Sequence, residues 1–228
     1  MPSNLAATIY IASTWLLPVI VAITFHEASH GFVAHRLGDD TAWRLGRVSF
    51  NPLKHIDPFG TVVLPFLLYM TGGFLFGYAK PVPVNFRALR DPRRDMVWVA
   101  AAGPVMNLAL ATAAGLCAHG IDYLPETAGQ WVAENLANAI DINVVLAVFN
   151  MIPLPPLDGG RVAVGLLPDA LAFPLARLER YGMPILIGLL IILPMIGQQI
   201  GMDLNVVARL ISGPVEAIID FIVALTGN

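Results

Sequence analysis

The sequence predicts an all-α polytopic membrane protein, with about five transmembrane helices and a re-entrant or broken membrane element between the first and second. Of its 228 residues, 57% are hydrophobic and only 13% are charged, whereas ordinary soluble domains carry roughly a quarter charged residues. The apolar residues gather in six long runs, at about 5–37, 60–78, 96–118, 131–152, 181–200 and 204–225. We therefore expect a single integral membrane domain over residues 1–228, with a core at about 5–165 and C-terminal helices at about 181–226.

The first apolar run is long enough to cross a membrane. Residues 5–25 contain no charged side chain, and about 20 such residues span the hydrocarbon of a bilayer as a helix. No Lys or Arg precedes this run, and it continues directly into His26, unlike a cleaved signal peptide. We expect it to remain as the first transmembrane helix.

The second run, 60–78, differs from the others because it contains Pro65 and the pair Gly72-Gly73. These residues suit an irregular element packed against protein better than a continuous spanning helix. We therefore expect this run to enter the membrane without crossing it.

The basic residues predict the topology. Nine of the thirteen Lys and Arg residues lie within 36–94 and three more within 161–180, while the loops 119–130 and 201–203 contain none. If 60–78 does not cross, the positive-inside rule places both basic regions in the cytoplasm. This predicts five crossings with the N-terminus outside. The last run contains Arg209 and Glu216, so a surface amphipathic helix is the alternative there.

The first run leads into the motif His26-Glu27-Ala28-Ser29-His30. Two histidines four residues apart share one face of a helix, so both imidazoles can bind one metal ion, with the Glu placed as a general base. The alternative is that these side chains only hydrogen-bond to neighbouring helices. Three ionisable groups within one turn at membrane depth are costly and usually mark a functional site. We favour the metal site.

A catalytic zinc site normally has a third protein ligand and keeps one position open. His35 lies nine residues from His26, which is roughly 180° around a helix of 3.6 residues per turn, so we exclude it. Asp158 is a better candidate because three prolines precede it and two glycines follow it, which ends the helix and allows a tight turn. The alternative is that Asp158 only caps the next helix. The histidine pair and Asp158 both lie near the C-terminal ends of predicted transmembrane helices. These two helices end on the same side of the membrane only if the run 60–78 does not cross it.

These features together resemble the site-2 protease family of intramembrane zinc metalloproteases. The resemblance is carried, in order, by HEASH at 26–30, NPLKHIDPFG at 51–60, AAGPVMN at 101–107 and NMIPLPPLDGG at 150–160. It implies zinc held by His26, His30 and Asp158, with Glu27 as the catalytic base. It also implies that Asn150 positions substrate or stabilises the oxyanion, with a helix-to-helix hydrogen bond as the alternative. The chain leaves no room for the PDZ or CBS domain of larger members, so it resembles the minimal, core-only type.

Other residues of these motifs allow more than one interpretation. His55 and Asp57 would point the same way in an extended segment, where they are candidates for orienting a ligand, holding substrate or binding metal in a resting state. A loop network that stabilises the re-entrant element is the alternative. Gly103, Pro104 and Asn107 either form a pinched helix beside the active site or simply allow close helix packing, which we favour.

The resemblance implies hydrolysis of peptide bonds within or near transmembrane segments, as in regulated intramembrane proteolysis. Expected partners are membrane-spanning protein substrates and the lipid bilayer, with no nucleic acid. The expected location is the bacterial inner membrane, with the active site toward the cytoplasm. A zinc transporter is disfavoured because 6–25 offers no ionisable path apart from Tyr10. An inactive relative is disfavoured by the intact HExxH motif and Asp158.

Overall fold

The computed structural model describes residues 2–63 and 80–228, which are almost entirely helical, with no β-strand in these two ranges. The long helices are α1 (Pro2–Arg36), α4 (Pro92–Ala118), α5 (Glu126–Asn150) and α10 (Val206–Thr226). The shorter ones are α2 (Thr41–Arg44), η1 (Pro52–Lys54), η2 (Pro58–Val63), η3 (Phe86–Ala88), η4 (Ile121–Tyr123), α6 (Asp158–Leu166), α7 (Asp169–Arg177), η5 (Leu178–Tyr181), α8 (Gly182–Ile187), η6 (Gly188–Ile192) and α9 (Leu193–Ile200). The predicted all-α class is confirmed.

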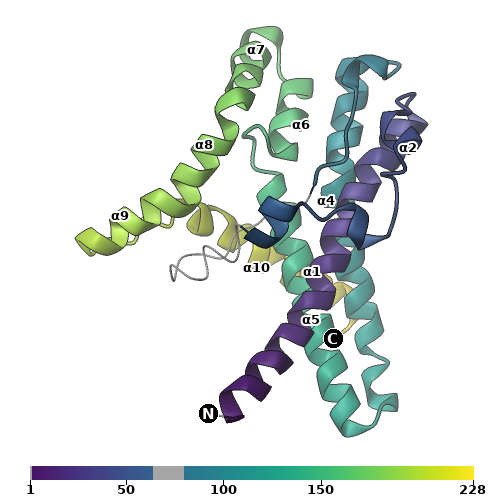
Figure 1. Cartoon of the computed structure of the whole chain (residues 1–228), viewed down its shortest axis with the longest axis vertical. Coiled ribbons are helices and arrows are strands. Elements are labelled where there is room, and N and C mark those ends of the chain that lie inside the picture. Colours follow the sequence, from purple (N-terminus) through teal and green to yellow (C-terminus); the bar gives the residue numbers. More distant parts are fainter. Residues whose placement is uncertain (1, 64–79) are drawn as a thin grey trace.

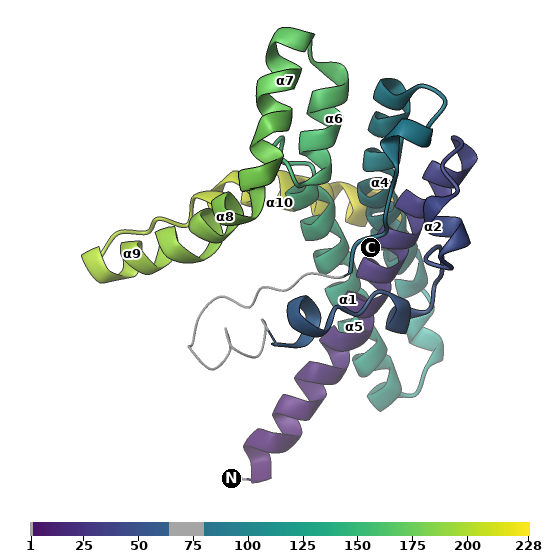
Figure 2. The ribbon, with the colours of Figure 1, turned by 45° about the horizontal axis from the view of Figure 1, so that its top comes forward.

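Helices α1, α4 and α5 form the centre of the molecule. Figures 1 and 2 show them running side by side, with the N-terminus at the lower end of α1. Polar side chains fasten α5 to α1: Trp131 donates to the Ser13 hydroxyl at 3.0 Å, and Asn138 donates to the Thr14 carbonyl at 3.0 Å. Lipid hydrocarbon offers these polar groups no hydrogen-bond partner. The two bonds therefore fix the position of α5 against α1.

The chain after α5 turns back toward the same end of the molecule. α5 ends at Asn150, the proline-rich turn 151–157 follows, and α6 begins at Asp158. In Figure 1, α6 and α7 form a hairpin beside the upper end of α4. Arg93 of α4 holds this hairpin by donating to the Gly165 carbonyl at 3.1 Å, to the Asp169 carboxylate at 2.6 Å and to the Leu167 carbonyl. The hairpin therefore places the start of α6 next to α1 and α4.

Four helical stretches of the described chain are long and apolar enough to cross a membrane: Leu5–Arg36, Pro92–Ala118, Glu126–Asn150 and Asp169–Ile200. They correspond to four of the five predicted crossings. The fifth run forms α10, which carries Arg209, Glu216 and Asp220 and is not among them. The predicted re-entrant run, 60–78, is described only as far as η2, and its residues 64–78 lie outside the described residues, so that prediction stays open.

Helix α10 has a direction that differs from the one we expected. Where α10 crosses α4, contacts advance together along both helices: Ala111 packs with Ile222, Gly115 faces Thr226, and His119 donates to the Thr226 carbonyl at 2.6 Å, so the C-terminal ends of the two helices meet. Five consecutive crossings would make the fifth helix antiparallel to the second. The C-terminus instead lies beside the end of α4 at His119.

Candidate metal centre

His26 and His30 lie one turn apart on α1, with side chains buried at the contact with α4. Their Nε2 atoms are 3.1 Å apart, and both residues are less than a tenth exposed. The Nδ1 atom of His26 lies 2.6 Å from Asn107 Oδ1, and Nδ1 of His30 lies 2.7 Å from the Val99 carbonyl oxygen. Because both partners are acceptors, each Nδ1 carries the hydrogen and donates it. In the neutral ring, each Nε2 then keeps a free lone pair.

The orientation of the Asn107 amide is fixed by its own contacts. Its Nδ2 group donates to the Ala22 carbonyl at 3.2 Å and to Asn143 Oδ1 at 2.8 Å. The Oδ1 atom must therefore face His26. Metal-binding histidines usually donate their second ring hydrogen to such a group, which fixes the tautomer and the ring plane.

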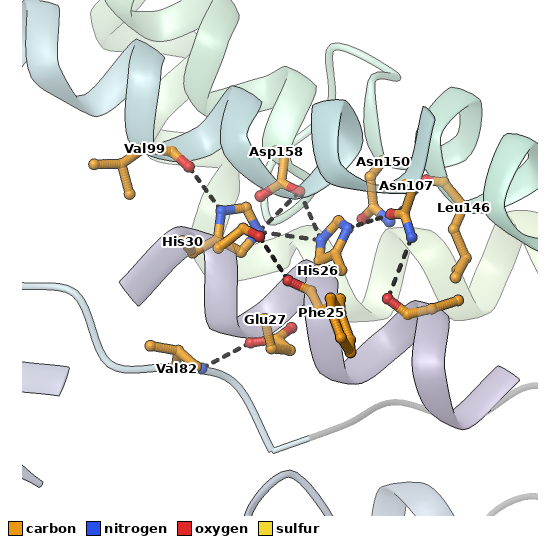
Figure 3. A network of polar contacts seen from close by, with 12 residues as sticks. Phe25, His26, Glu27, His30, Val82, Val99, Asn107, Leu146, Asn150 and Asp158 are labelled. Atoms are coloured by element: carbon orange, nitrogen blue, oxygen red, sulfur yellow. Dashed lines mark hydrogen bonds and ion pairs between the residues drawn. The ribbon is translucent and has the colours of Figure 1, made fainter. Parts of the chain in front are cut away.

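Asp158 reaches the histidine pair from the start of α6. Its Oδ2 atom is 3.2 Å from His26 Nε2 and 3.4 Å from His30 Nε2, and Figure 3 shows the carboxylate directly above the two rings. The residue at the N-cap of α6 is Leu157, and no side chain caps the helix. The alternative in which Asp158 serves only as a helix cap is therefore wrong.

Two glycines allow the turn that delivers Asp158. A Cβ atom on Gly159 would overlap the Met151 carbonyl group, and one on Gly160 would overlap the backbone of Leu154 and Pro155. Both glycines are buried against the preceding turn. Glycine is required here by close backbone approach. Both residues lie in the first turn of α6 without a positive φ, so the backbone freedom that we expected of them is not what the structure uses.

The donor set matches what a metal ion needs. Two bare imidazole nitrogens and one carboxylate oxygen lie within 4.8 Å of one another, and all three residues are buried. Among the described residues, Asp158 Oδ2 is buried without a hydrogen-bond partner. Three electron-rich atoms this close repel one another unless a cation lies between them. Two histidines and a carboxylate are ligands that zinc accepts in catalytic sites.

Glu27 lies on a neighbouring face of α1, next to this donor set. Its Oε2 atom accepts a hydrogen bond of 2.8 Å from the Val82 backbone N–H, and Figure 3 shows its carboxylate turned toward Val82. The second oxygen, Oε1, has no hydrogen-bond partner in the described part of the chain.

The structure keeps His35 and Asn150 out of the donor set. His35 stacks on Trp43 and bonds to Asp40 Oδ1 at 2.7 Å, as expected for a polar group at the membrane edge. This bond, helped by Arg44, holds the pKa of the Asp40 carboxyl below its ordinary value. Asn150 donates to the Leu146 carbonyl of its own helix at 2.9 Å, which is neither of the two contacts predicted for it. A role for Asn150 toward substrate stays a prediction.

His55 and Asp57 take part in loop contacts. His55 is buried, with its Nε2 atom 2.8 Å from the Ser49 carbonyl, and its own carbonyl accepts from the Lys80 N–H at 2.9 Å. Asp57 accepts from the Gly60 N–H at 2.7 Å. These contacts match the loop-network alternative.

Sequence reasoning underestimated one face of α4. Val99, Gly103 and Asn107 are spaced four residues apart and all contact the histidine pair. A Cβ atom on Gly103 would lie 2.5 Å from His26 Cε1 and 2.6 Å from His30 Nε2. The spacing of the glycine and the asparagine was the available signal, but close packing alone explained it equally well.

Comparison with known proteins gives consistent results. The chain is 40% identical over 172 residues to "Putative zinc metalloprotease YwhC" of Bacillus subtilis, covering 73% of this chain and 75% of that protein. It is 31% identical over 192 residues to "Putative zinc metalloprotease Rip2" of Mycolicibacterium smegmatis, covering 83% and 69%. It is 29% identical over 159 residues to "Putative zinc metalloprotease MJ0611" of Methanocaldococcus jannaschii, covering 70% and 72%.

No family model and no solved structure matches the chain. The curated relatives nevertheless share one activity in their names, and each is matched over more than two thirds of its length. The buried group His26, His30 and Asp158 offers a place for the metal that those names imply. The chain is a zinc metalloprotease and belongs to the site-2 protease family.

Proposed function

We propose that this protein hydrolyses peptide bonds within or near transmembrane segments of other membrane proteins. Zinc would be held by Nε2 of His26, Nε2 of His30 and Oδ2 of Asp158. The observation that carries the proposal is the convergence of these three metal-ligating atoms, at 3.1 to 3.4 Å from one another, inside a bundle of apolar helices.

Different residues of the site would have different roles in the hydrolysis. When bound, zinc supplies a Lewis acid that lowers the pKa of water toward 7 and polarises a carbonyl group. Glu27 would accept the proton of the attacking water at Oε1, since Oε2 is engaged by Val82, and would pass it to the leaving amine. Asn107 and the Val99 carbonyl hold the two imidazoles in the tautomer that this requires.

The depth of the site supports a substrate inside the membrane. His30 precedes the end of α1 by six residues, which corresponds to on the order of 10 Å at about 1.5 Å per residue. A soluble substrate would have to enter the bilayer to reach it. Membrane-spanning segments are therefore the substrates that fit this position, and the basic residues at the same end of α1 and α4 support a site toward the cytoplasm of a bacterial inner membrane.

The test uses the purified protein in liposomes with a model single-span substrate. Glu27→Gln should keep about one zinc per chain and lose cleavage by on the order of a thousandfold, because the site keeps its ligands but loses its base. Asp158→Ala should lose both zinc and cleavage. Glu126→Gln, at an exposed glutamate at the start of α5, is the matched control and should behave as the wild type.

Zinc content and cleavage products are read by metal analysis and mass spectrometry. Undiminished cleavage by Glu27→Gln would remove that residue from the mechanism. Cleavage of the same sequence only when it is placed in a soluble host protein would contradict the intramembrane part of the proposal and leave the metalloprotease itself standing.

A further inference from the structure

A short extended segment fixes the position of Glu27. We call residues 80–84 the strap; they precede η3 and have no helical or strand structure. The buried residue Val82 donates its N–H to Glu27 Oε2 at 2.8 Å, as Figure 3 shows. A second contact brings the strap to α1 one turn further on, where a Cβ atom on Gly31 would lie 2.9 Å from Val82 Cγ1.

Arg47 holds the strap in this position. Its Nη2 group donates to the Lys80 carbonyl at 2.8 Å and to the Pro81 carbonyl at 3.4 Å. On the other side, the Lys80 N–H donates to the His55 carbonyl at 2.9 Å. Prolines at 81 and 83 fix two backbone angles and remove two N–H groups, so the strap offers few hydrogen bonds of its own. The guanidinium is its main side-chain anchor among the described residues.

We propose that Arg47 is a positioning residue for the general base, acting through the strap. The inference rests on the proposed function of Glu27. A glutamate side chain has several rotatable bonds, and catalysis needs its carboxylate held within about 0.5 Å of the productive geometry. One hydrogen bond to Oε2 orients the carboxylate and leaves Oε1 available for a proton. If Arg47 releases the strap, the Val82 N–H moves away and Glu27 loses that restraint.

Hydrogen exchange tests the structural half of the proposal without any substrate. Since 81 and 83 are prolines, the strap has only three amide hydrogens, on Lys80, Val82 and Val84, so a peptide covering it reports on few positions. Glu27→Ala removes the acceptor and should speed exchange at Val82 by at least about tenfold, whereas Glu27→Gln keeps an acceptor oxygen and should preserve most of the protection. Arg47→Met should speed exchange as Glu27→Ala does.

The matched control is Arg44→Met. Arg44 lies three residues before Arg47, is largely exposed and pairs only with Asp40 among the described residues. This variant should leave exchange in the strap unchanged. If Arg47→Met does not fold, Arg47→Lys carries the test, because its single ammonium can keep only part of the two carbonyl contacts. Its exchange should be intermediate.

Cleavage kinetics test the catalytic half. Arg47→Met should retain zinc and KM but lower kcat by between about tenfold and a hundredfold, as expected for a misplaced catalytic group. Arg47→Lys should recover part of kcat, and Arg44→Met all of it. A merely structural role would instead reduce zinc content and thermal stability together with kcat.

Three results would overturn the proposal: unchanged exchange in Arg47→Met, faster exchange with unchanged kcat, or a rise in kcat. The last would mean that the strap restrains Glu27 rather than preparing it. Failure of the proposed function would be recognised separately, because the wild-type protein would then show no zinc-dependent cleavage while its strap exchange could still be measured.

Discussion

Gly103 of α4 faces both imidazoles of the site and leaves no room for a side chain, because a Cβ atom there would lie 2.5 Å from His26 Cε1 and 2.6 Å from His30 Nε2. Each ring is also held at its Nδ1 atom by an acceptor of α4, Asn107 for His26 and the Val99 carbonyl for His30. The rings therefore cannot swing away to make room for a larger neighbour. The histidines keep their positions because Gly103 has no side chain and because the two acceptors hold their Nδ1 atoms.

Gly103→Ala should impair the metal site more than the fold. The added methyl group would lie 2.5 to 2.6 Å from ring atoms of both histidines, so the rings must shift or break their Nδ1 bonds. We expect zinc affinity to fall by about 10- to 100-fold, the range seen when the support of a ligand is lost.

Equilibrium dialysis with a zinc chelator measures this affinity. Gly213→Ala is the matched control, because nothing lies within 4 Å of the position where its Cβ would be, and it should bind zinc like the wild type. Wild-type zinc affinity in Gly103→Ala would show that the helices separate easily at this point.

The residues of the HExxH motif were predictable because their geometry is local. Four residues of helix bring His26 and His30 together whatever surrounds them. Asn107 was not assigned, since its role depends on how α4 is rotated against α1, and no spacing within one helix contains that information. Its value to the site became visible only from the contact with His26 Nδ1.

At the scale of elements, the turn between α5 and α6 decides where the third ligand lies. The glycines at its end pack directly on the backbone of residues 151–155, and Gly182 of α8 packs on Pro155 and Pro156 from the other side. The turn is thus enclosed between elements on both sides. A change in its backbone therefore disturbs the start of α6, where Asp158 lies.

Gly160→Ala should disturb this turn. Its Cβ would overlap the backbone of Leu154 and Pro155 rather than a flexible side chain, so the start of α6 must move. We expect the free energy of unfolding to fall by about 1–3 kcal/mol, as for overpacked sites, with loss of zinc because Asp158 lies two residues away.

Thermal unfolding of the metal-free protein and zinc content of the loaded protein measure the two effects. Gly188→Ala is the control, since no atom lies within 4 Å of its added Cβ; it should change neither quantity. Full zinc loading in Gly160→Ala would mean that Asp158 tolerates a displaced turn.

At the scale of the whole molecule, the direction of α10 sets the side of the C-terminus. Besides the bond between His119 and Thr226, Asn228 donates to the Gly115 carbonyl at 2.9 Å. The chain therefore ends beside the turn that joins α4 to α5. An apolar cavity of about 520 Å³ lies further along the same helices, lined by residues of α4, α5 and α10.

Cysteine labelling tests this arrangement, and the single native cysteine, Cys117, is first replaced by serine. A maleimide that cannot cross the membrane should label Asn228→Cys from the same side as Tyr123→Cys, a residue 90% exposed in the α4–α5 connection. Arg94→Cys, at the start of α4, is the control for the opposite side. Labelling of Asn228→Cys together with Arg94→Cys would support five consecutive crossings instead.

Composition and local spacing were enough to predict the membrane class, the helical fold, the histidine pair and the candidate carboxylate. Each of these depends on neighbouring residues in the chain or on overall hydrophobicity. Four features could be recognised only in the tertiary structure. They are the rotation of α4, the position of Asn107, the contact of the strap with Glu27 and the direction of α10. These features depend on which faces of separate helices meet, and within a bilayer many faces are equally apolar. Hydrophobicity alone therefore cannot choose between them; close packing of small residues and a few buried hydrogen bonds do.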